Sequence, residues 1–342
     1  MRLAIIALAA TLTLSACSGD GSSLTPAPGV AAAITPVAGD QQTVTVGHPV
    51  AINPSVRVTD GLGDPVANVS VTFSVKLGGG SADGTDQTTD ATGLATVAQW
   101  TAGTAAGSNT LSALSPGLEG SPVEFTATAV AGPAVALSKN AGDNQTASVR
   151  SAVGPVSVLV SDAYGNPVAD IPVTFVVASG GGSVKGGQQV TGVNGIATVG
   201  SWTLGATLGQ NTLTAAATGL SGPPLVFAAT ATPLPTAVTV NVANNFFRSL
   251  RNGSGDEGGL FGHAAVDTIA VGGTVTWEWV GRGHNVTPYG TAFTESGTHS
   301  LPFTFGPITF NARGEYTYRC TIHSRVERYL GLILMRGVII VR

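Results

Sequence analysis

One feature constrains this chain more than any other: the sequence repeats itself at an offset of 102 residues. Phe73 recurs as Phe175, and Trp100 recurs as Trp202. Between such landmarks, runs such as 69–75 alternate apolar and polar residues and are bounded by Gly, Pro, Asn and Asp. Alternation with period two is typical of a strand with one buried face. The sequence therefore predicts two copies of a unit of about 100 residues, each folded as a β-sandwich.

The composition agrees with small β domains. Of 342 residues, 47 are Gly and 19 are Pro, while 43% are hydrophobic and only 10% are charged. The hydrophobic content excludes a disordered chain, and the scarcity of Lys, Glu, Gln and Met excludes a large helical protein. A net charge of −4 provides no electrostatic footprint for nucleic acid. We expect an all-β protein without a nucleic-acid partner.

The N-terminus indicates export. One cationic residue and the apolar run 3–14 precede small residues, which is typical of a secretory signal over 1–16. Leu14-Ser15-Ala16-Cys17 resembles the lipobox of bacterial lipoproteins; an ordinary signal peptide with a chance cysteine is the alternative. The resemblance implies an acylated Cys17, a flexible tether over 17–31 and a membrane anchor. Ser18 resembles the pattern of outer-membrane lipoproteins, which face the periplasm or the cell surface.

The two repeats share a set of motifs. Asp-x-x-Gly-Asx-Pro-Val occupies 60–66 and 162–168, and a glycine triplet occupies 78–80 and 180–182. Val-Thr-Phe and a Gly-x-Ala-x-Val segment ending near a Trp complete the pattern. Together these motifs resemble bacterial immunoglobulin-like domains of the invasin and intimin type. The resemblance implies the fold and the roles of stalk or adhesive array, which such modules mostly serve.

The resemblance implies two immunoglobulin-like domains, the first over 32–131 and the second over 132–232. The acidic residues Asp60, Asp64 and Asp162 lie in the shared turn motif. Calcium coordination is one interpretation of these carboxylates. Turn chemistry is the simpler one, because Asp and Asn side chains satisfy local backbone donors.

A third domain is expected over 237–342, after the short stiff linker 233–235. Four of the five His residues and Cys320 lie in this last part of the chain. Residues 237–247 and 269–280 are predicted strands, the second with its apolar residues on one face. Any chemistry of the protein is therefore expected here.

A set of soft metal ligands lies in this third domain. Once Cys17 is acylated, Cys320 has no second cysteine with which to form a disulfide in an oxidising compartment. His323 follows it three residues later, and His284 and Met335 complete a set of two His, one Cys and one Met. Thiolate, thioether and imidazole together select copper, and such a set is typical of electron-transfer sites. The alternatives are zinc, which seldom uses thioether, and an inert buried thiol.

Four motifs carry a resemblance to the plastocyanin/azurin family of cupredoxins. They are Gly-x-Thr-Val-Thr-Trp at 272–277, His-Asn-Val at 284–286, Tyr-x-Tyr-x-Cys-x-x-His at 316–323 and Met-x-Gly-x-Ile-x-Val at 335–341. The resemblance covers residues 237–342 and implies a Greek-key β-sandwich holding one type 1 copper. It implies a role for Asn285 in joining the two ligand loops by hydrogen bonds. The implied copper ligands are His284, Cys320, His323 and Met335.

Two positions depart from the family pattern. Only a few residues usually separate the second His from the Met, whereas His323 and Met335 are twelve positions apart, with 324–334 between them. An axial Met335 is one outcome of this longer segment, and a three-coordinate copper is the alternative. Arg319, rather than a tyrosine, precedes Cys320. The exposed edge of His323 is then the expected port for electrons.

The remaining His residues and the arginines complete the predictions for this domain. His263 and His299 have no partner spacing and are expected on the surface. Arginines flanking the thiol would attract an acidic redox partner; the alternative is that they solubilise the apolar segment 329–334. These arginines are Arg319, Arg325, Arg328 and Arg336.

The leading hypothesis is a membrane-anchored type 1 blue-copper electron-transfer protein whose repeats act as a spacer arm. One alternative is a cell-surface adhesion or structural lipoprotein with a copper-binding cap; another is copper capture or delivery. We do not expect an enzyme. Multicopper oxidases and copper nitrite reductases need a second copper centre with several further His, and the chain has five His in total.

Overall fold

The computed structural model describes residues 29–244, 246–255, 263–322 and 335–342. Regular structure in these ranges consists of strands, so the predicted all-β fold class is confirmed. No helix in the described ranges is long and apolar enough to cross a membrane. The chain divides into two compact units, 1–133 with 161–166 and 134–160 with 167–342. The second unit therefore contains most of the second repeat and all of the C-terminal domain.

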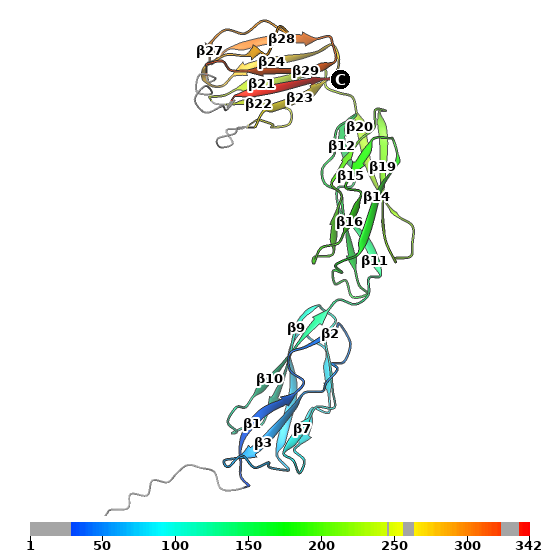
Figure 1. Ribbon diagram of the computed structural model, residues 1–342, viewed down its shortest axis with the longest axis vertical. Coiled ribbons are helices and arrows are strands. Elements are labelled where there is room, and N and C mark those ends of the chain that lie inside the picture. Colours follow the sequence, from blue (N-terminus) through cyan, green and yellow to red (C-terminus); the bar gives the residue numbers. More distant parts are fainter. Residues whose placement is uncertain (1–28, 245, 256–262, 323–334) are drawn as a thin grey trace, which may run out of the picture. The chain divides into compact units, whose positions relative to one another are not determined.

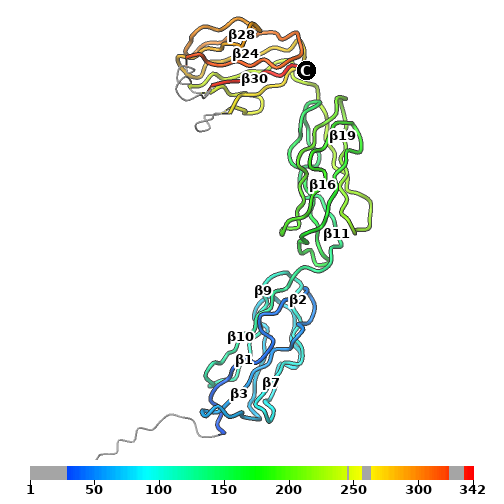
Figure 2. Tube along the Cα trace, in the orientation of Figure 1, coloured from blue at the N-terminus to red at the C-terminus, as the bar shows by residue number. Residues whose placement is uncertain are grey.

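The first repeat consists of two main sheets and a short third one. Their strand orders are β1-β3-β7, β2-β10-β9-β4-β6 and β5-β8. Strand β2 pairs with β10 in parallel, and the other pairings are antiparallel. Figure 2 shows β1, β3 and β7 together on one side of the repeat. The strands are β1 (Ala31–Ala38), β2 (Gln42–Thr45), β3 (Ser55–Asp60), β4 (Ser70–Leu77), β5 (Ser81–Asp83), β6 (Asp86–Thr88), β7 (Leu94–Thr96), β8 (Gln99–Thr101), β9 (Gly107–Leu114) and β10 (Val123–Val130).

The second repeat has the same topology, strand for strand. Its orders are β11-β13-β17, β12-β20-β19-β14-β16 and β15-β18, with β12 parallel to β20. The 102-residue sequence repeat is therefore a repeat of structure. The strands are β11 (Ala136–Ala141), β12 (Gln145–Ser148), β13 (Ser157–Ser161), β14 (Pro172–Ser179), β15 (Ser183–Lys185), β16 (Gln188–Val190), β17 (Ile196–Thr198), β18 (Ser201–Thr203), β19 (Gly209–Ala217) and β20 (Leu225–Thr232).

The repeated apolar residues form a separate core in each repeat. Trp100 and Trp202 are both fully buried, and the phenylalanine rings of β4 and β10 and their counterparts are buried as well. Along β4, Val71 and Phe73 are buried while the residues between them face outward. Burying side chains of this size stabilises each sandwich by about 1.5–3 kcal/mol per residue.

The glycine triplets serve backbone geometry. Gly80 has φ +80° and Gly182 has φ +91°, in the region that favours glycine. A Cβ on Gly80 would collide with the carbonyl oxygen of Thr101, and one on Gly182 with that of Thr203. The triplets are thus required by a close approach of two chain segments.

The aspartates of the shared turn bind backbone amides, as the turn interpretation predicts. Asp60 accepts hydrogen bonds from the amides of Leu62 and Asp64, each at 2.9 Å. Asp162 accepts from the amide of Tyr164 at 2.9 Å and from that of Asn166 at 2.8 Å. Within the described ranges no cluster of three His, Cys, Asp or Glu residues could hold a metal ion.

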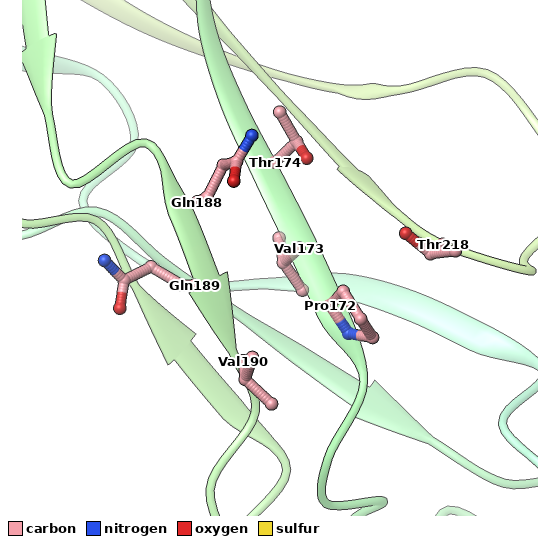
Figure 3. Close-up of a pocket in the computed structure, with 7 residues that line it drawn as sticks. All are labelled: Pro172, Val173, Thr174, Gln188, Gln189, Val190 and Thr218. Carbon is pink, nitrogen blue, oxygen red and sulfur yellow. The ribbon is translucent and has the colours of Figure 1, made fainter.

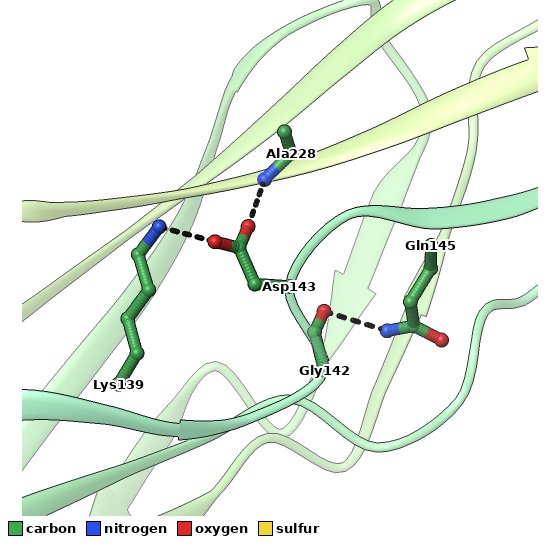
Figure 4. A network of polar contacts seen from close by, with 5 residues as sticks. All are labelled: Lys139, Gly142, Asp143, Gln145 and Ala228. Atoms are coloured by element: carbon green, nitrogen blue, oxygen red, sulfur yellow. Dashed lines mark hydrogen bonds and ion pairs between the residues drawn. The ribbon is translucent and has the colours of Figure 1, made fainter.

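A second repeated aspartate was missed in the sequence. Asp143 forms a 2.6 Å ion pair with Lys139 and accepts a 2.9 Å hydrogen bond from the amide of Ala228 (Figure 4). Asp40 accepts from the amide of Thr126 at 2.7 Å in the first repeat. Asp40 and Asp143 are 103 positions apart, whereas the shared motifs of the two repeats are 102 apart. A comparison of the sequence with itself at a constant offset therefore does not pair these two aspartates.

The C-terminal domain is a sandwich of two four-stranded sheets, ordered β22-β21-β24-β28 and β23-β30-β29-β26, beside the small pair β25-β27. Figure 1 shows β28 beside β24, with which it pairs at the edge of the first sheet. Its strands are β21 (Ala237–Val242), β22 (Phe247–Ser249), β23 (Ala265–Ile269), β24 (Gly273–Trp279), β25 (Arg282–His284), β26 (Thr287–Pro288), β27 (His299–Ser300), β28 (Thr304–Phe310), β29 (Gly314–Arg319) and β30 (Arg336–Val341).

Both strands expected at the start of this domain are divided in two. Residues 237–247 span β21, a turn closed by the Ala243 amide on the Phe246 carbonyl at 3.0 Å, and the start of β22. Residues 269–280 include the end of β23, a turn at Gly272 with φ +78°, and β24. The expected apolar face of β24 is buried: Val275, Trp277 and Trp279.

Replacing Asp162 with Ala is expected to lower the free energy of unfolding by about 1–3 kcal/mol, because several amides lose their acceptor. Burial raises the pKa of Asp162, but hydrogen bonds from Asn166 and from the Gly132 amide outweigh burial and hold it below its ordinary value. The native state then binds this proton more weakly than the unfolded state, so the stabilisation falls as the pH drops below about 4. Urea unfolding at pH 7 and pH 3 measures both effects. The exposed Asp64 is the control, and equal losses in Asp162→Ala and Asp64→Ala would contradict this account.

Candidate metal centre

His284 is held in place at the end of β25. Its side chain is 1% exposed, and its residue pairs with His299 of β27. The indole Nε1 of Trp279 donates a 3.1 Å hydrogen bond to the carbonyl oxygen of His284. The imidazole is thus buried, and Trp279, which belongs to the hydrophobic core, holds the backbone of His284.

Cys320 lies directly after β29 and is 2% exposed. Its Sγ is 3.8 Å from Nδ1 of His284. Because residues alternate along a strand, Cys320 and the fully buried Tyr318 both face the core. The thiol and the imidazole therefore meet in a dry environment, although they are 36 residues apart in sequence.

Met335 lies opposite Cys320. Strands β29 and β30 are antiparallel and in register, with Arg319 opposite Arg336. The next pair outward is Cys320 and Met335, and the Cys320 amide donates to the Met335 carbonyl at 3.2 Å. Met335 is 2% exposed and belongs to the same core. Strand register brings the two residues together despite the long intervening segment.

Asn285 joins the two loops that carry His284 and Cys320. Its Nδ2 donates to Oγ1 of Thr321 at 2.7 Å, and its Oδ1 accepts from the Thr321 amide at 2.8 Å. Asn285 is 7% exposed, so both hydrogen bonds are largely shielded from water. The side chain holds the two loops at a fixed separation.

His323 and Cys17 lie outside the described residues, as do Arg325 and Arg328. Of the four ligands expected from the sequence, the described structure brings together His284, Cys320 and Met335. A cluster of three or more His, Cys, Asp or Glu is absent from the ranges that the structure describes.

The spacing of the described donors fits a bound metal ion, and their chemistry suits copper. At bond lengths of about 2.0 Å (N) and 2.3 Å (S), as found in zinc sites, two ligands of one metal lie about 3.5–3.7 Å apart. The 3.8 Å between His284 Nδ1 and Cys320 Sγ is close to that separation. Imidazole and thiolate suit copper, and the neighbouring thioether residue favours copper over zinc.

His299 differs from the expectation of a surface residue. Its ring is half-buried and stacks on Phe303, with centroids 3.4 Å apart and planes 10° apart. Its Nε2 is 2.7 Å from the Ser296 carbonyl oxygen. The β25-β27 pair carries His299 next to His284, and no spacing in the sequence signals this pairing. His263 is exposed, in agreement with the expectation.

Ser296 gives further support to the loop that carries His284. The Val286 amide donates to Ser296 Oγ at 2.8 Å, and the Ser296 amide donates to the Val286 carbonyl at 3.0 Å. Val286 is fully buried beneath this contact. A lone serine ten residues downstream gives no sequence signal for such a role.

Arg319 packs against an aromatic side chain. Its guanidinium lies 4.6 Å from the centroid of the Tyr289 ring, in a cation–π arrangement. Tyr289 is 42% exposed. The sequence has Arg319 rather than a tyrosine before Cys320, and the pairing of β26 with β29 brings Tyr289, the residue after β26, against this arginine.

One buried carboxyl group was not anticipated. Asp267 is fully buried on β23 and accepts a 2.7 Å hydrogen bond from the Ser249 hydroxyl. Burial raises the pKa of Asp267, although the Ser249 hydrogen bond and the charge of Arg251 oppose the shift. Its sequence context, an alternating strand, predicts an apolar residue at this position.

No protein-family model matches the chain, and no curated protein matches it. Among solved structures, the Escherichia coli adhesin FdeC is similar at 16% identity over 93% of this chain and 99% of FdeC, with a TM-score of 0.43. Yersinia pseudotuberculosis InvD is similar at 14% identity over 84% and 92%, with a TM-score of 0.37. The D0-D1 domain of intimin is similar at 20% identity over 58% and 98%, with a TM-score of 0.25. At these identities and scores the likeness indicates no shared activity.

Replacing Asn285 with Ala should loosen the two loops, because it removes both hydrogen bonds to Thr321 and leaves a shielded amide without its acceptor. The expected cost is about 1–3 kcal/mol. Thr321→Val is the matched control, because it removes only the hydroxyl and keeps the amide hydrogen bond. Hydrogen exchange at the Thr321 amide should accelerate in Asn285→Ala well beyond Thr321→Val. Equal exchange in both variants would exclude the joining role of Asn285.

Proposed function

We propose that this chain is an exported electron-transfer protein whose C-terminal domain holds one type 1 copper ion. The two immunoglobulin-like repeats act as a spacer arm between the membrane and this domain. The observation that carries the proposal is the buried pair His284 Nδ1 and Cys320 Sγ, 3.8 Å apart, with Met335 opposite Cys320.

The proposed ligands come from two parts of the domain, the end of β25 and the segment that joins β29 to β30. His284, Cys320 and His323 would hold the copper, with Met335 as the weaker fourth ligand. Copper, when bound, supplies a one-electron couple between its two oxidation states. The role of His323 is inferred from its spacing of three residues to Cys320 in the sequence.

The protein holds the proposed ligands in place and shields them from water. Trp279 fixes the carbonyl of His284, and Asn285 fixes the neighbouring loop through Thr321. His284 and Cys320 are at most 2% exposed, which keeps water away from the thiolate. Ligands that are held in place before and after electron transfer need little rearrangement, and outer hydrogen bonds of this kind orient metal ligands.

The full chain loaded with Cu(II) is expected to turn blue through charge transfer from the Cys320 thiolate. Cys320→Ser should remove the colour, because oxygen replaces the sulfur donor. Visible absorption with a one-to-one copper titration is the measurement. Cys17→Ala is the control and should stay blue. A colourless wild-type chain, or a blue Cys320→Ser variant, would rule out the type 1 centre.

A second candidate function is a cell-surface adhesion or structural lipoprotein in which copper only stabilises the terminal domain. Two of the three hydrophobic cores belong to the repeats, and their signature residues serve cores and turns. Proteins of similar fold include an Escherichia coli adhesin. This candidate keeps the same proposed copper ligands but gives the copper a stabilising role instead of electron transfer.

Electron transfer separates the two candidates. A carrier exchanges electrons rapidly with a small redox protein, whereas a stabilising copper does not. Arg319 and Arg336 border the proposed centre, which favours an acidic partner. The rate with an acidic redox protein should then fall as salt rises, since screening shortens the Debye length to about 8 Å near physiological ionic strength. A slow rate at every salt concentration would favour the structural candidate.

We also propose that acyl chains on Cys17 anchor the protein to the outer membrane. Each buried methylene contributes about 0.8 kcal/mol to membrane affinity, so several chains anchor the protein stably. Cys17→Ala should move the protein from the membrane pellet to the soluble fraction. Cys320→Ser is the matched cysteine control and should remain in the pellet. Retention of Cys17→Ala in the pellet would contradict the anchor.

A further inference from the structure

The two repeats present different surfaces on the same scaffold. In each repeat, one side of the five-stranded sheet covers the core and the other faces outward. On the second repeat, Val176 of β14 is 54% exposed, Val190 of β16 is 57% exposed and Val226 of β20 is 49% exposed. Large apolar side chains are thus gathered on the outward side of three strands of one sheet.

The offset of 102 residues gives the counterpart of every outward residue in the first repeat. Asp86 corresponds to Gln188, and Glu124 corresponds to Val226. Two further counterparts change from hydroxyl to aliphatic: Ser74 to Val176 and Thr88 to Val190. At these four positions the second repeat carries uncharged residues where the first has two carboxylates and two hydroxyls. Elsewhere on the same sheet the change runs the other way, from exposed Leu77 to Ser179 and from exposed Leu114 to Ala216, so the difference between the repeats is the loss of charge.

Cross-strand pairing makes these residues neighbours. Val176 lies opposite Thr214, and Thr214 lies opposite Val226, so the three form one row across β14, β19 and β20. The Thr214 hydroxyl donates to the Val176 carbonyl at 3.1 Å. The hydroxyls of Ser179 and Thr212 bond each other at 2.7 Å. Because these hydroxyls have partners within the sheet, covering them costs little.

The surface continues to the sheet edge. A groove of about 550 Å³ lies along β14 and β16, beside Pro172, Thr174 and Val190 (Figure 3). Gln188 lies opposite Thr174, and Val190 lies opposite Pro172. The residues that line this groove are all uncharged.

We propose that this surface is a contact between two copies of the chain. We call it the repeat 2 face, defined by Thr174, Val176, Val190, Thr214, Ala216 and Val226. A face without charge meets its own copy without repulsion, and a two-fold dimer brings one face against itself. The residues of the face include no aromatic ring or basic group that would recognise a sugar, a nucleic acid or an anionic lipid.

The dimensions suit a weak dimer. Strand β14 has eight residues, which span about 27 Å at about 3.4 Å per residue. The long strands β14, β19 and β20, about 4.8 Å apart, give a width of about 14 Å, and the three-residue β16 adds a short edge of about 50 Å². The face therefore covers about 440 Å² on each copy, or about 900 Å² in the dimer, in the range of weak and transient contacts. Dissociation constants in the micromolar range are expected.

Sedimentation equilibrium tests the proposal on the full chain carrying Cys17→Ala, between about 1 and 100 µM. The chain should form dimers, and Val176→Lys should weaken dimerisation at least tenfold, because like charges then meet at the centre of the face. Ser74→Lys is the matched control, since it places the same lysine at the equivalent position of the first repeat. It should leave the dimer unchanged.

Val226→Lys is the second variant and should act as Val176→Lys does. Circular dichroism verifies that each variant keeps the wild-type fold, as expected for half-exposed positions. A chain that stays monomeric at about 100 µM would overturn the proposal and leave the face to a different partner. Equal weakening by Val176→Lys and Ser74→Lys would overturn it as well, as would a dimer that neither valine substitution weakens. The copper proposal is untouched by either result, because no ligand lies in the second repeat.

Discussion

The register between β29 and β30 is the constraint on which the proposed centre depends. Pairing of Arg319 with Arg336 places Cys320 against Met335, and their backbone hydrogen bond closes the ladder. The length of the segment between them does not alter this pairing, because the strands set it. A one-residue slip would turn Tyr318 and Cys320 away from the core, so the buried aromatic layer also protects the register.

The packing of aromatic side chains around Tyr318 explains why the register between β29 and β30 does not shift. Tyr318 packs edge-on against Trp277, with centroids 5.3 Å apart, and against Phe247 at 4.8 Å. Burying aromatic rings contributes more than any single hydrogen bond of the loops above. The core thus fixes the strands, and hydrogen bonds such as those of Asn285 then fix the loops that carry the candidate ligands. The buried carboxyl of Asp267 is the exception in this core, and its partner Ser249 reduces the cost of burial.

The repeats show that one scaffold tolerates different outer surfaces. Their cores and turns depend on the same residue types, as in the buried Trp100 and Trp202. Their outward residues are not required by the fold, so Glu124 and Val226 occupy equivalent positions at little cost to either sandwich. Function can therefore diverge on the outer face of the sheet while the module itself stays constant.

The sequence by itself determined the all-β class, the repeat and the apolar faces, because alternation with period two reports which side of a strand is buried. It also singled out His284, Cys320, His323 and Met335 as candidate ligands, by residue type and by the resemblance of their motifs to those of cupredoxins. Only the tertiary structure decided which segments meet. The turns that divide 237–247 and 269–280, the stacking of His299 on Phe303 and the packing of Arg319 on Tyr289 all arise from strand pairing. Contacts between residues far apart in sequence depend on register and sheet order, and a local pattern does not encode either one.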